Sequence, residues 1–172
     1  MNMFAEIKVE THHAEAIARG LFAIAHSDGL HEREAALVAS FWAESGGGAK
    51  ALATLERSTP ITGEELAATL DTLPLRMLFL KTALLMAFAD GQVSGQESTI
   101  VRGFADALGL SSELSVLEAE VKDYLLSHRH IVRTWAGGSL SVIFEILRHR
   151  HREERLAEGR AALRAEVGDH VT

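Results

Sequence analysis

Four carboxylates recur at two similar corners of the chain. The stretches AIAHSDGLHERE, residues 23–34, and AFADGQVSGQE, residues 87–97, each run from apolar residues into an Asp-Gly pair and on to a glutamate. Asp28 and Glu34 belong to the first corner, and Asp90 and Glu97 to the second. Carboxylate oxygens are the ligands that hard divalent ions such as Ca²⁺ and Mg²⁺ prefer. The four residues are therefore candidate ligands of one such cation.

Helical spacing predicts that these carboxylates lie on core-facing stripes. Counting back from the first aspartate, residues separated by 4, 3 and 4 positions share one helical face: Asp28, Ile24, Leu21 and Ile17. A helix C-terminus carries partial negative charge, so an aspartate there is unfavourable unless something neutralises it. A cation, a basic side chain, backbone donors or a proton would each do so.

The same residues also fit an ordinary structural role. Ser94-x-x-Glu97 is a capping box, and Asp-Gly is a common way to end a helix. Each corner taken alone favours this capping role. The recurrence of the acidic pair favours a cation site, so both interpretations remain open. The spacing is not that of an EF-hand loop, which has more acidic positions.

Composition predicts one helical domain that covers residues 1–172. Hydrophobic residues make up 47% and charged residues 24%, with only two prolines and no cysteine, so disulfides and thiolate sites are excluded. The N-terminal residues lack the apolar segment of a signal peptide. The most apolar run, residues 75–89, contains two basic residues and is shorter than the roughly 20 apolar residues of a membrane span. We expect a cytoplasmic protein that does not span the membrane.

Periodicity, capping residues and helix breakers predict an all-α bundle of about seven to eight helices and no strand. Thr11 is the expected N-cap of the first helix and Thr62 that of the fourth, while Pro74 falls in the first turn of the fifth. Seven of the predicted helices cover approximately residues 12–27, 32–44, 49–57, 74–89, 95–108, 112–127 and 140–166, and another opens at Thr62.

An internal repeat organises these helices. Aligning Asp28-Gly29 with Asp90-Gly91 places Glu34 opposite Glu97 when the first turn is one residue shorter. Repeat one covers about residues 12–45 and repeat two about residues 75–109. Two copies of a helix–Asp-Gly–helix unit predict a globule with pseudo-twofold symmetry.

At these residues the chain resembles the tellurite-resistance TerB family and its TerB-like relatives. FADGQVSGQESTIVRGFADALGLS, residues 88–111, is similar to the family's pattern of an apolar residue, Ala-Asp-Gly and a later glutamate, and residues 23–41 form a weaker copy. The resemblance covers about residues 12–125 and implies an all-α fold of about seven helices. It implies stress-resistance functions with protein partners, some of them membrane-bound. It also implies a divalent-cation site that maps here to Asp28, Glu34, Asp90 and Glu97.

Other classes of function find little support. The chain lacks a nucleophile motif, a phosphate-binding loop and an H-E-x-x-H motif, so we predict that it is not an enzyme. The net charge of −7 argues against nucleic acid as a partner. The amphipathic helix at residues 140–166 is expected to pack on the body or to form a homodimer. Two alternatives remain: a structural interaction module without metal and, further behind, a carboxylate-based metallohydrolase.

The nine histidines are expected to be mostly solvated surface residues. His128 and His130 are spaced by two, as are His149 and His151, and this spacing turns side chains to different faces of a helix. We expect no transition-metal site from these pairs or from the adjacent His12-His13. His26 and His31 flank Asp28 and are weaker candidates for its surroundings.

Overall fold

Seven helices and no strand make up the part of the chain that the computed structural model describes, residues 8–88, 93–127 and 160. This confirms the all-α prediction. Apart from Arg160, the predicted helix at residues 140–166 lies outside the described residues, as does the second Asp-Gly corner, so the pseudo-twofold repeat stays a prediction. The helices are α1 (Thr11–Ala25), α2 (Glu32–Glu44), α3 (Ala49–Arg57), α4 (Gly63–Thr69), α5 (Leu73–Phe88), α6 (Gly95–Ala107) and α7 (Leu114–Ser127).

Most helix boundaries follow from local signals. Helices α2 and α3 begin and end at the expected residues, and Thr62 caps α4 by accepting a hydrogen bond from the Glu65 backbone N–H. The N-cap of α1 is Glu10, one residue before the predicted Thr11. Helix α7 begins at Leu114 because residues 111–113 form a turn after Gly109, whose φ of 71° suits a residue without a side chain.

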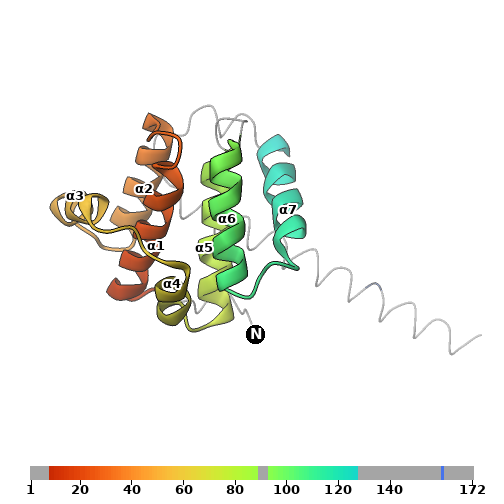
Figure 1. Cartoon of the computed structure of the whole chain (residues 1–172), viewed down its shortest axis with the longest axis horizontal. Helices are drawn as coiled ribbons and strands as arrows, with labels where there is room; N and C mark the ends of the chain where they lie inside the picture. Colours follow the sequence, from red (N-terminus) through yellow and green to blue (C-terminus); the bar gives the residue numbers. More distant parts are fainter. Residues whose placement is uncertain (1–7, 89–92, 128–159, 161–172) are drawn as a thin grey trace, which may run out of the picture.

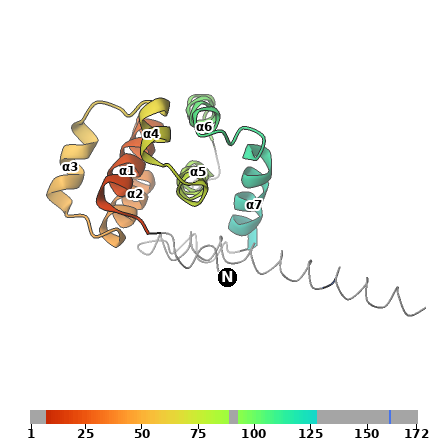
Figure 2. The same ribbon diagram turned by 90° about the horizontal axis from the view of Figure 1, so that it is seen from below.

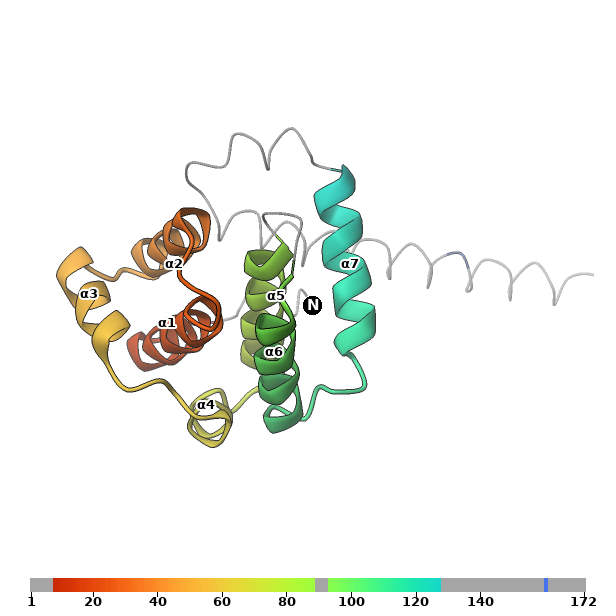
Figure 3. The ribbon, with the colours of Figure 1, turned by 45° about the horizontal axis from the view of Figure 1, so that its top comes forward.

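Helix α5 is the centre of the bundle. It contacts α1, α2, α6 and α7, and it lies between the α1–α2 pair and α7 (Figures 1 and 3). Figure 2 shows α3 at the opposite side of the molecule from α7. Eleven residues of α5 are buried, in agreement with a helix that is apolar nearly all round. Within the described ranges, no helix has both the length and the hydropathy that crossing a membrane requires.

Close packing joins α1, α5 and α6. The rings of Phe79 and Phe104 meet edge to face, with their centroids 5.4 Å apart. A Cβ atom on Gly20 would lie only 2.6 Å from the Phe79 ring. Glycine at this position therefore allows α1 to approach α5 closely.

The two basic residues of α5 both have polar partners. The Arg76 guanidinium donates hydrogen bonds to three backbone carbonyls at the ends of neighbouring helices, those of Ala67, Leu70 and Leu108. Such carbonyls have no partner within their own helix. Lys81 is almost fully buried, and its Nζ lies 3.6 Å from Glu120 Oε2 of α7. The charges in this apolar run thus tie α5 to its neighbours.

Candidate functional site

The N-terminus of α6 forms the predicted capping box. The Ser94 hydroxyl accepts a hydrogen bond from the Glu97 backbone N–H at 3.0 Å, and Glu97 Oε2 accepts one from the Ser94 backbone N–H at 2.9 Å. These contacts satisfy backbone donors that the first turn of a helix leaves without partners. The capping role of Glu97 is therefore confirmed.

The N-terminus of α2 places Glu34 in the equivalent position. Glu34 is the third residue of its helix, and its Oε2 accepts a hydrogen bond from the His31 backbone N–H at 3.1 Å. Glu34 and Glu97 thus each cap their own helix with one carboxylate oxygen.

The same two glutamates also meet each other. Glu34 and Glu97 keep only 6% and 3% of their surface exposed, and the Glu97 side chain is close enough to act on the carboxyl group of Glu34. Burial is the largest cause that raises the pKa of Glu34, to about 7, and the hydrogen bond and negative charge of Glu97 add to it. The His31 backbone donor acts in the opposite direction. At neutral pH this carboxyl pair is therefore close to exchanging a proton.

The neighbouring Glu97 carboxylate disfavours a negative charge on Glu34. Two ionised carboxylates in contact repel each other, while one shared proton leaves a net charge of one. Each glutamate lies in the first turn of its helix, where the helix dipole is positive and stabilises that charge.

Asp28 does not lie on the core-facing side of its helix in the way that helical spacing predicts. Asp28 is exposed, so its predicted place on the core-facing stripe is wrong. The reason is that α1 ends at Ala25, and residues 26–28 form a turn in which helical periodicity no longer applies. Within the described residues, Asp28 does not form a close three-ligand group with Glu34 and Glu97. Asp90, the fourth candidate ligand, lies outside the described residues.

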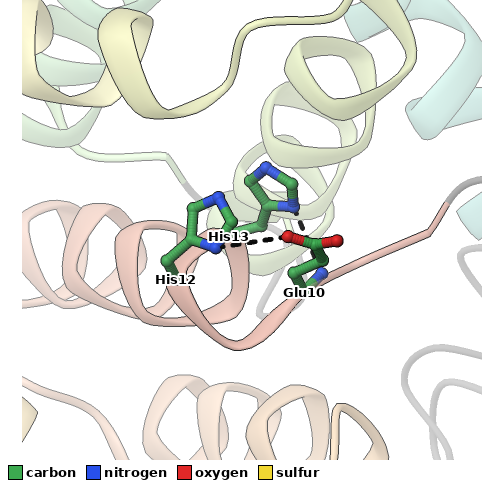
Figure 4. Close-up of side chains that lie close together, drawn as sticks. All are labelled: Glu10, His12 and His13. Atoms are coloured by element: carbon green, nitrogen blue, oxygen red, sulfur yellow. Dashed lines mark hydrogen bonds and ion pairs between the residues drawn. The ribbon is translucent and has the colours of Figure 1, made fainter.

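A different group of potential ligands lies at the start of α1. Glu10, His12 and His13 bring a carboxylate and two imidazoles together, and one potential ligand atom from each lies within 4.8 Å of the others (Figure 4). The prediction from sequence considered the adjacent histidines but missed Glu10. The position of Glu10 directly before the helix could have indicated this contact. An N-cap side chain turns back over the first turn of its helix, which here contains both histidines.

The two histidines near Asp28 have other partners. His26 Nε2 lies 3.6 Å from Glu56 Oε1, and both side chains line a cleft of about 310 Å³ between α1 and the α3–α4 region. His31 is exposed and forms the N-cap of α2.

Comparisons of the chain with protein-family models, with curated proteins and with solved structures found no match. The TerB resemblance therefore rests on the residues of the two corners.

Proposed function

We propose that this chain is a non-enzymatic, TerB-like domain that binds a divalent cation of the Ca²⁺ or Mg²⁺ class and acts in the cytoplasm through protein partners in a stress response. The observation that carries the proposal is the burial of the Glu34 and Glu97 carboxyl groups as close neighbours. One glutamate comes from each of the two helix–corner–helix units that resemble the family.

A cation is a suitable replacement for the shared proton. The pKa of Glu34, raised to about 7, places the loss of its proton in the neutral pH range, where a cation can take the place of that proton. A divalent ion neutralises both carboxylates at once, and oxygen ligands favour a hard ion. In this proposal Asp28 and Asp90 complete the ligand set, with Asp28 turning inward from its exposed position in the first corner.

The alternative is a structural interaction module without metal. The capping bonds of Glu34 and Glu97 favour it, because they give both residues a structural role. In this alternative a proton alone joins the two carboxyls, and the predicted C-terminal helix at residues 140–166 provides a homodimer contact.

Thermal unfolding distinguishes the two functions. Protein stripped with a chelator is melted at pH 7 with Ca²⁺, Mg²⁺, Mn²⁺ or Zn²⁺ added in turn. An ion at a hundred times its dissociation constant adds about 2.7 kcal/mol to the free energy of unfolding. For a chain of this size the melting temperature then rises by about 5–10 °C. A rise with a hard ion supports the cation site, whereas no rise with any ion leaves the structural module.

Matched variants locate the ion. Glu97→Gln should abolish the rise, because it removes one carboxylate of the pair. Glu65→Gln is the control, since Glu65 occupies the same capping-box position in α4 but is exposed. The double variant Asp28→Asn with Asp90→Asn tests the remaining ligands. If an added ion raises the melting temperature of that double variant as much as that of the wild type, the two aspartates are not ligands of the ion.

A further inference from the structure

We propose that Glu10, His12 and His13 form a second metal site, specific for a transition-metal ion of the Zn²⁺ class, at the N-terminus of α1. This site is separate from the glutamate pair and does not depend on the function proposed for that pair.

The distances suit a small tetrahedral ion. His12 Nδ1 lies 3.6 Å from Glu10 Oε2, and the three potential ligand atoms all lie within 4.8 Å of one another. Two ligands on a tetrahedral zinc, each about 2.1 Å from the metal, lie about 3.4 Å apart. Figure 4 shows the Glu10 carboxylate beside both imidazole rings, whose centroids are 4.0 Å apart. Side-chain rotations must bring the ligand atoms from these separations to about 3.4 Å to close the group around an ion.

His13 provides the fixed ligand of the group. Its side chain is buried, with 8% of the residue surface exposed, and its Nδ1 accepts a hydrogen bond from the Glu10 backbone N–H at 3.2 Å. A nitrogen that accepts a hydrogen bond carries no proton, and this is the form of imidazole that binds metals. To bind an ion at this nitrogen, the His13 ring must turn and give up its hydrogen bond with the Glu10 backbone N–H.

Glu10 and His12 provide the adjustable ligands. Their side chains are 47% and 59% exposed, so they can turn toward an ion without disturbing the core. The Lys8 ammonium lies 3.3 Å from Glu10 Oε1 and competes for the carboxylate. The Lys8 side chain is 84% exposed, so it can move into solvent when an ion binds.

The ligand types select the ion. Imidazole nitrogen suits Zn²⁺, Cu²⁺ and Ni²⁺, whereas Ca²⁺ and Mg²⁺ prefer oxygen alone. Three protein ligands leave the fourth tetrahedral position open for water or for a side chain of a partner. The arrangement therefore separates this site chemically from the all-oxygen pair of Glu34 and Glu97.

The test is a Zn²⁺ titration of the untagged full chain by calorimetry, together with the visible absorption of bound Co²⁺. His12→Ala and Glu10→Gln should each weaken Zn²⁺ binding at this site by about tenfold or more. Both residues are exposed, so circular dichroism should show an unchanged helix content. His26→Ala removes another exposed histidine of the α1 region and should leave the titration unchanged, as should Glu97→Gln.

Three results would overturn the proposal. The first is a wild-type chain that does not bind Zn²⁺. The second is a titration of His12→Ala that equals that of the wild type, which would assign the ion to histidines elsewhere in the chain. The third is an equal loss of affinity in His12→Ala and His26→Ala, which would indicate unspecific binding.

Discussion

The carboxyl group of Glu34, the third residue of α2, is buried beside the carboxyl group of Glu97, the third residue of α6. The two residues are 63 positions apart in the chain. Each also caps its own helix, so one side chain serves local helix formation and a long-range contact together. The stability of this end of the bundle should therefore depend on the proton or cation that neutralises the two carboxyl groups.

Stability should depend on pH through Glu34. The pKa of this group is about 7 in the folded protein and 4.5 in its ordinary state. Between these values the folded protein holds a proton that the unfolded chain releases, so the free energy of unfolding falls as the pH rises. Below pH 4.5 this stabilisation is fully present, and above pH 7 it is lost. The loss should amount to about 1–3 kcal/mol, measured by urea unfolding in the presence of a chelator.

Two variants isolate this pH effect. Glu34→Gln should match the wild type at pH 5 and exceed it at pH 8, because the amide donates to the Glu97 carboxylate without a charge. Glu65→Gln should be less stable than the wild type by a similar amount at pH 5 and at pH 8, since hydrogen bonds at Thr62 lower the pKa of Glu65 and this group is ionised at both pH values. A pH slope in Glu34→Gln that equals the wild-type slope would contradict the role of the pair.

Gly20→Ala should destabilise the protein. The added Cβ would lie 2.6 Å from the Phe79 ring, which is fully buried and cannot easily move. Such overpacking costs about 1–3 kcal/mol, seen as a lower melting temperature. Gly103→Ala is the matched control, because Gly103 lies within α6 with nothing within 4 Å of the new Cβ. That control should gain about 0.5–1 kcal/mol from helix propensity. Equal effects of the two substitutions would contradict the close α1–α5 contact.

Arg76→Met should also destabilise the fold. It removes the donor of three carbonyl hydrogen bonds at the ends of α4 and α6 while keeping much of the apolar stem. The loss of charged hydrogen bonds to half-buried carbonyls should cost about 2–4 kcal/mol in urea unfolding. Arg102→Met is the control, because Arg102 is exposed on α6. Surface substitutions usually change the free energy of unfolding by less than about 0.5 kcal/mol. A change that small for Arg76→Met would show that water replaces these hydrogen bonds.

Local sequence signals were sufficient for most of the helices. The capping boxes of α4 and α6 join residues three positions apart, so backbone geometry alone brings their groups together. The same holds for the apolar run of α5, whose composition required burial on most sides. Asp28 shows the limit of this approach. Its predicted facing assumed that the helix continued, but α1 ended three residues earlier.

The sequence by itself determined the helical fold, most helix boundaries and the capping role of Glu97, because these depend on contacts within a few residues. It also indicated that the two corners carry related carboxylates. Only the tertiary structure decided that Glu34 and Glu97 touch, since their contact depends on how α2 and α6 each pack against α5. The folded start of α1 likewise placed the Glu10 carboxylate beside two histidines whose spacing alone predicted no metal site.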